Sequence, residues 1–276
     1  MREIECRAAT EERARRPAGP GGPGGGGEEG EGGPACEVKP GINRVWWNLR
    51  SEPSTEIRLR TSPLYAPDVK PGPEGWRRPS GAGRIELLVP PGTYTVTLTA
   101  GEQKLTQKLN VLKDPHSGGT EGDIQTQTQF LSGLRDEMNA IAASVNQIES
   151  IRAQLEALEK QLGTDDTGKT IRKAADDLAE KLIATEGKAL QLKATGRGQD
   201  DVRWPPMLAS KVTYLADQAE SSDFAPTTQQ VAVGEELKKQ GDQFQQEYQQ
   251  VVSKDVTAFN AMLREKNIPN IMVKMP

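Results

Sequence analysis

The apolar positions between residues 123 and 162 recur at spacings that alternate between three and four. The row consists of Leu131, Leu134, Met138, Ile141, Val145, Ile148, Ile151, Leu155, Leu158 and Leu162. This spacing is a heptad seam on one face of a long helix. The step from Ile148 to Ile151 is three where four was due, so the seam contains a local stammer. A helix of this length with an apolar stripe needs partner helices beside it.

The remainder of the C-terminal half supplies such partners. A second seam of fours and threes, from Ile171 to Leu192, predicts a helix over about residues 167–193. Pro205 and Pro206 suit the first turn of a third helix, because proline is tolerated there. Thr227 and Gln230 have capping-box spacing for a fourth helix that reaches about residue 266. We therefore expect an antiparallel bundle of three to four long helices over residues 123–266, followed by an extended tail over 267–276.

The first half shows the two-residue alternation of β-strands. Alternating runs occur at residues 45–49, 56–60, 84–89, 93–99 and 103–112. They are separated by Gly/Pro turns, and no helical pattern lies between them. This arrangement predicts an antiparallel β-sandwich of the immunoglobulin or fibronectin type over residues 39–113, with a linker over 114–122. The predicted fold class is thus a multidomain β + α protein, a sandwich followed by a helical bundle.

The N-terminal region has a different character. Residues 1–12 include a short candidate strand, and residues 13–38 are dominated by Gly, Pro and Glu. Such a tract buries too little apolar surface to offset its ordering entropy, so we expect a disordered insertion. Two cysteines, Cys6 and Cys36, flank it. They could form a disulfide, but two free thiols is the interpretation we favour, because two cysteines are too few for a disulfide framework.

Composition narrows the function classes. The net charge of −4 gives no support to nucleic-acid binding. The sequence has no apolar run of about 18 residues, so we expect no membrane span. The first residues lack the apolar core of a signal peptide, so the protein is cytoplasmic or this chain is a piece whose start lies elsewhere.

Two motifs imitate catalytic sites. Residues 163–170 match the P-loop expression letter for letter, but a heptad helix precedes them in place of a strand, and Asp165 and Asp166 would repel phosphate. We interpret this stretch as a helix–helix turn whose Asp and Thr residues cap the second helix. His116 lies with Asp114 and Ser117 in a linker, where no scaffold can assemble a triad.

The sequence also lacks the residue patterns of a zinc site and of a glycosidase active site. One histidine and two cysteines cannot complete a four-ligand zinc site without carboxylates. Acid pairs such as Asp176–Asp177 are typical of solvated helix faces, whereas glycosidases need two carboxyls across a cleft. We therefore expect no catalytic residue, no cofactor and no metal in this chain.

A candidate binding surface lies in the polar loop before the third helix. A loop held by rigid helices is a usual place for binding residues. Its candidate residues are Arg197, Gln199, Asp200, Arg203 and Trp204. In the alternative interpretation the arginines pair with Asp200, Asp201 or helix-end carbonyls and close the end of the bundle. Trp46 and Trp76 are further candidates for stacking a sugar ring, although an exposed Trp beside Trp47 is more simply a domain-interface residue.

Two stretches resemble a known family. Residues 41–50, Gly-Ile-Asn-Arg-Val-Trp-Trp-Asn-Leu-Arg, and then residues 91–98 resemble the Ig-like module that follows bacterial β-propellers. The loop at 195–206 resembles the helical tail of the same proteins, which are labelled sortilin-like or BNR-repeat glycosyl-hydrolase-like. This chain lacks the propeller, has the insertion before Val38, and has Asn48 where the family usually has Asp. The resemblance implies a periplasmic or secreted location.

These observations predict a non-catalytic accessory or scaffold region of such a bacterial protein, with a protein partner or an upstream β-propeller domain. The alternative is a carbohydrate-binding module that serves a hydrolase domain absent from this chain. A nucleotide-binding protein is a third hypothesis, which depends on Lys169 in the P-loop-like turn.

Overall fold

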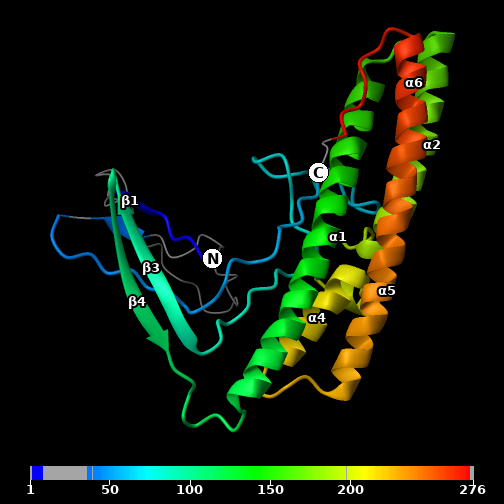
Figure 1. Cartoon of the computed structure of the whole chain (residues 1–276). Coiled ribbons are helices and arrows are strands. Elements are labelled where there is room, and N and C mark those ends of the chain that lie inside the picture. The colour runs from blue at the N-terminus through cyan, green and yellow to red at the C-terminus, as the bar shows by residue number, and fades with distance from the viewer. Residues whose placement is uncertain (1, 9–35, 39, 197, 274–276) are drawn as a thin grey trace. The chain divides into compact units, whose positions relative to one another are not determined.

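The structure is a computed structural model that describes residues 2–8, 36–38, 40–196 and 198–273 (Figure 1). The chain divides into two compact units, Met1–Glu52 and Pro53–Pro276. The predicted insertion at 13–38 lies outside the described residues, except for its last three.

The first unit contains a short parallel pair, β1 (Cys6–Ala8) and β2 (Cys36–Val38). Cys6 lies opposite Cys36 in the register and is disulfide-bonded. Our interpretation of two free thiols is therefore wrong. The strand predicted at 45–49 is also absent, because Leu49 adopts a left-handed backbone (φ 58°) that interrupts an extended run.

The β-sandwich predicted over residues 39–113 is wrong. Within the described part of the second unit, the strands are a single antiparallel hairpin, β3 (Gly92–Ala100) and β4 (Gln103–Val111). Gly101 adopts φ 58° in the connecting turn, which glycine tolerates without steric cost. The predicted strands at 93–99 and 103–112 are thus confirmed, and those at 56–60 and 84–89 are not.

Residues 53–61 instead form an extended strap along the first helix, α1 (Glu121–Gln161). Ile57 and Leu59 are buried, as their alternation predicts. Helix side chains bind part of the strap backbone: Asn139 accepts from the Thr55 N–H at 2.7 Å, and Asn146 accepts from the Arg58 N–H at 2.7 Å. Leu59 exchanges two backbone hydrogen bonds with Arg77, at 2.9 and 2.8 Å. Alternation reports which face is buried, but it does not report which groups satisfy the backbone, and for this reason the strand prediction failed here.

The helical predictions are largely confirmed. After α1 come α2 (Asp166–Ala189), α4 (Leu208–Glu220), α5 (Thr228–Gln250) and α6 (Thr257–Glu265), with a four-residue α3 (Asp200–Arg203) before α4. Capping boxes start α1 at Thr120–Asp123 and α5 at Thr227–Gln230. A π-helical turn, Val251–Val256, joins α5 to α6.

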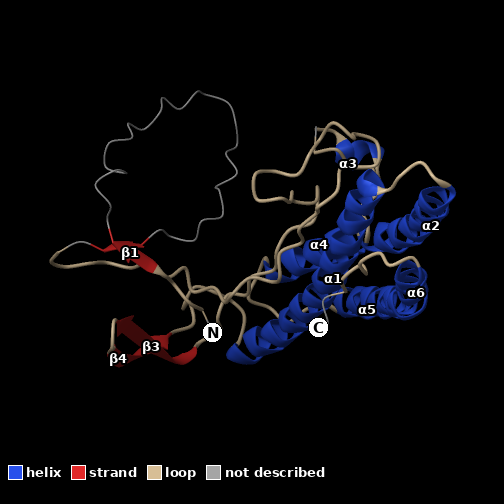
Figure 2. Ribbon diagram, turned by 90° about the horizontal axis from the view of Figure 1, so that it is seen from above, coloured by secondary structure: helices blue, strands red, loops and turns tan. Residues whose placement is uncertain are grey.

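The helices of the second unit share one core. Helix α1 packs against α2, α4 and α5, and α2 packs against α5 and α6, so the helices are grouped together in Figure 2. Met138, Ile141, Val145, Ile148, Ile151 and Leu155 are all at most 1% exposed. Ile148 and Ile151 are both fully buried, so the three-residue step at the stammer keeps the seam continuous.

The C-terminal tail, like the strap, is held by hydrogen bonds between helix side chains and its backbone. Asn260 exchanges two hydrogen bonds with the backbone of Ile271, and Gln154 exchanges two with the backbone of Met272. The tail forms neither helix nor strand as far as residue 273, as predicted, and Ile271 is buried.

Candidate functional site

A groove of about 890 Å³ lies among α4, α5, the loop at 191–206 and the turn at Ser80–Gly81. Leu215 and Leu237, both buried, belong to its lining together with the exposed side chains of Tyr214 and Val233. Amide, hydroxyl and charged groups complete the lining, among them Gln191, Ser210, Lys211, Thr213, Asp217 and Gln218. The groove thus combines an apolar centre with polar groups, as ligand-binding clefts do.

The loop that was predicted as a binding surface forms one wall of this groove. Asp200 is buried, and its carboxylate accepts from the backbone N–H groups of Thr195 at 2.9 Å and Gly196 at 2.7 Å. These bonds fold the loop back onto the start of α3, where Gln199 has a left-handed backbone of φ 60°. The role of Asp200 is therefore to shape the loop, because its oxygens already accept bonds from the chain.

Trp204 lies where the loop joins α4 and lines the groove. Its ring is 5.8 Å from that of Tyr65, and the Lys193 ammonium lies 5.0 Å from the Trp204 ring and 5.5 Å from the Tyr65 ring. An ammonium at this distance from an aromatic ring is attracted by the electrons of the ring face. The contacts of Lys193 and Tyr65 with Trp204 therefore hold the 62–66 segment against the loop, beside the groove that Trp204 lines.

The other predicted site residues that the structure describes are not among the residues that line the groove. Trp46 belongs to the first unit and is 70% exposed, with the Arg44 guanidinium 5.6 Å from its ring. Trp76 is half-buried beneath the Arg58 guanidinium, 5.0 Å from its ring. Arg203 is exposed, and Arg197 lies outside the described residues. Within the described lining, the structure brings together Asp200 and Trp204 from the predicted set.

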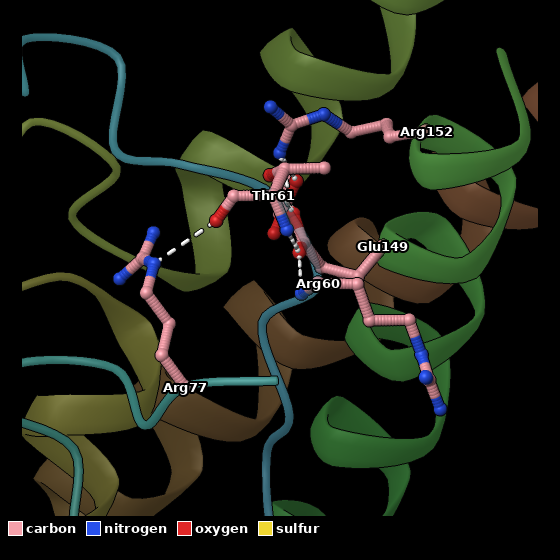
Figure 3. A network of polar contacts seen from close by, with 6 residues as sticks. Arg60, Thr61, Arg77, Glu149 and Arg152 are labelled. Atoms are coloured by element: carbon pink, nitrogen blue, oxygen red, sulfur yellow. Dashed lines mark hydrogen bonds and ion pairs between the residues drawn. The ribbon is translucent and has the colours of Figure 1, made fainter. Parts of the chain in front are cut away.

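A buried ionic cluster, which the sequence analysis missed, lies between α1 and α2 (Figure 3). One nitrogen of Arg152 donates to Glu149 and to Glu186, each at 2.6 Å. Glu149 also accepts from the Thr61 N–H and the Thr61 hydroxyl, both at 2.8 Å, and from the Arg60 N–H. Arg77 donates to the Thr61 carbonyl at 2.9 Å and completes the cluster.

Burial governs the protonation of this cluster. Glu186 is 0% exposed, and its Oε1 has no hydrogen-bond partner among the described residues. Burial, followed by the nearby charge of Glu149, raises the pKa of Glu186 to about 8, against only partial compensation from Arg152. The sequence signal for this cluster was weak. Glu149 and Arg152 directly follow the seam residues Ile148 and Ile151, but charged residues next to a seam usually lie on the solvent side of a helix.

The two motifs that imitate catalytic sites have structural roles. Asp165 caps α2 by accepting from the Gly168 N–H at 3.0 Å, so the helix–helix turn is confirmed. A Cβ on Gly168 would lie 2.2 Å from the Gly163 carbonyl oxygen, so close packing accounts for this glycine. Asp114 accepts the backbone N–H of His116 at 2.8 Å within the linker turn.

Comparison with protein-family models, curated proteins and solved structures gave no match. The resemblance to sortilin-like proteins therefore stays a prediction. Among the described helices, none is long and apolar enough to cross a membrane.

Proposed function

We propose that this chain is a non-catalytic accessory region that binds a segment of a partner protein in the groove between α4 and α5. The observation that carries the proposal is the groove itself, in which Tyr214 and Val233 expose apolar surface on two neighbouring helices. Exposed apolar side chains that gather around a cleft are typical of protein-interaction sites.

The charged side chains of the groove lining are Lys211, Asp200 and Asp217, and both acids already interact within the chain. Lys211 is exposed on α4, one turn before Tyr214, and forms no ion pair with any other described residue. The partner segment should therefore carry a row of apolar side chains and an acidic residue that meets Lys211. An amphipathic helix or an extended peptide lying in an apolar groove offers this combination.

The ionic cluster supports a structural role elsewhere in the unit. Glu149, Arg152 and Glu186 are all buried, and their bonds are made to one another and to the strap. A stiff bundle that holds a shaped groove suits an accessory or scaffold role.

Selection from a displayed peptide library tests the proposal. The wild-type chain should enrich peptides with an apolar row and an acidic residue. Val233→Lys should abolish the enrichment, because it places a charge in the groove. Val231→Lys is the matched control, since Val231 is an equally exposed valine of α5 that does not line the groove.

Two outcomes would contradict this function. Peptide enrichment that survives Val233→Lys would place binding elsewhere, and absence of enrichment would remove the proposal. Saturable quenching of tryptophan fluorescence by soluble oligosaccharides, together with no peptide enrichment, would favour the carbohydrate-binding alternative, for which Trp204 and Tyr214 supply rings in the groove.

A further inference from the structure

The hairpin β3–β4 has one apolar face that other described elements leave uncovered. Residue pairing places Tyr94 opposite Leu109, Val96 opposite Gln107, and Leu98 opposite Leu105 on this face. Val96, Leu98, Leu105 and Leu109 are between 37% and 64% exposed. Within the described part of the second unit, no other helix or strand packs against either strand. Isolated two-stranded hairpins are marginally stable in water, so this one needs a neighbour.

The two free edges of the hairpin differ in charge. The edge strand β3 reads Thr93-Tyr-Thr-Val-Thr-Leu-Thr99 and carries no charged residue. Strand β4 carries Lys104 and Lys108, and charged lysines on an edge strand oppose pairing with another chain. The edge of β3 is therefore the one that is open to a further strand.

The sequence of β3 is symmetric in chemical type about Val96. Threonine stands one and three positions away on either side, and Tyr94 and Leu98 stand two positions away. An antiparallel copy centred on Val96 would place Thr95 opposite Thr97 of the second chain and Tyr94 opposite its Leu98. Both pairings are favourable cross-strand neighbours, and apolar side chains stay on one face throughout.

We propose that β3 pairs edge to edge with β3 of a second copy of this chain, giving a four-stranded sheet around a two-fold axis at Val96. Pairing β4 in the same way about Thr106 would set Lys104 against Lys108 of the other copy, which is repulsive. The two-fold symmetry is the commonest arrangement of homodimers. An interface of one strand pair is small, so the dimer should dissociate in the micromolar range.

Sedimentation equilibrium of the full chain tests this pairing. The wild type should show a monomer–dimer equilibrium. Thr95→Glu combined with Thr97→Glu should give a monomer, because like charges then face each other twice across the axis. Within the hairpin the Thr95→Glu change is favourable, since Thr95 lies opposite Lys108, whose ammonium is 2.8 Å from the Thr95 hydroxyl, while Thr97 lies opposite the neutral Thr106.

Two control variants separate the pairing from a general charge effect. Thr95→Glu combined with Thr97→Lys should restore the dimer, because opposite charges then meet across the axis. Thr106→Glu, on β4, should leave the dimer intact. A wild type that is monomeric at every concentration, a dimer that survives the double-glutamate change, or a dimer lost equally in Thr106→Glu would each overturn the proposal.

Discussion

At the scale of single residues, the side chains that matter most are polar and buried. Glu149 satisfies two consecutive strap amides and one hydroxyl, and Arg152 links it to Glu186. Removing one partner of a buried ion pair strongly destabilises the folded protein, because the other charge stays buried without compensation. The sequence pattern did not single out these three residues as buried, because charged residues are rarely fully buried.

Glu186 makes folding stability depend on pH. Its pKa is about 8 in the folded protein against an ordinary 4.5, so the folded state keeps a proton that the unfolded state releases. Its contribution to stability is full below pH 4.5, declines as the pH rises, and is lost above about 8.

Glu186→Gln should remove this dependence, because a neutral amide takes the place of the protonated acid. Urea unfolding at several pH values across this window measures the effect. Glu156→Gln, at an exposed position of α1, is the control and should keep the wild-type slope. Equal slopes in wild type and Glu186→Gln would show that Glu186 does not hold its proton.

At the scale of elements, helix side chains take the place of neighbouring strands. Asn139, Asn146 and Glu149 lie along one face of α1 and bind the backbone of the strap at four residues. Asn146 also donates to the Glu56 carbonyl at 2.9 Å. The strap therefore stays extended without a regular sheet, because α1 side chains bind part of its backbone and Leu59 pairs with Arg77 in an isolated bridge.

Asn146→Leu should loosen the strap. It removes the hydrogen-bond partner of the Arg58 N–H and of the Glu56 carbonyl, which lie at an exposed and a half-buried position, so each lost bond should lower the free energy of unfolding by about 0.5–1.5 kcal/mol. Hydrogen exchange should become faster at residues 55–61 while the centre of α1 stays protected. Gln125→Leu, at an exposed amide of α1, is the control. Unchanged exchange in the strap would mean that its apolar residues alone hold it.

At the scale of the whole molecule, the chain has two units with different sources of stability. The second has a shared helical core, whereas the first has a three-residue strand pair beside a disulfide-bonded cysteine. Disulfides persist in oxidising compartments and are reduced by the thiol pools of the cytosol.

Cys6→Ser should affect the first unit alone. Closing the loop between Cys6 and Cys36 stabilises the folded unit by about 3–4 kcal/mol in the chain-entropy model. Without this bond the β1–β2 pairing should be lost. The helical signal in circular dichroism should melt at the wild-type temperature. The same result is expected when dithiothreitol is added to the wild type. A lower melting temperature of the helices would show that the two units are coupled.

The helices of this protein and their buried faces follow from the local sequence pattern alone. A heptad pattern predicts both the helical conformation and the face that is buried. The capping residues Thr120 and Thr227 mark where α1 and α5 begin. It also placed the β3–β4 hairpin, and it identified Asp200 and Trp204 within a loop that forms a wall of the groove.

The contacts of the alternating segments follow from the fold and not from their pattern. Ile57 and Leu59 alternate as in a strand, yet α1 binds the backbone of Arg58 between them, and Leu59 pairs with Arg77 in an isolated bridge. Arg152 of α1 likewise joins Glu149 to Glu186 of α2. The physical reason is that periodicity records which side chains leave water. The partners of buried polar groups depend on contacts between distant parts of the chain, which no local pattern records.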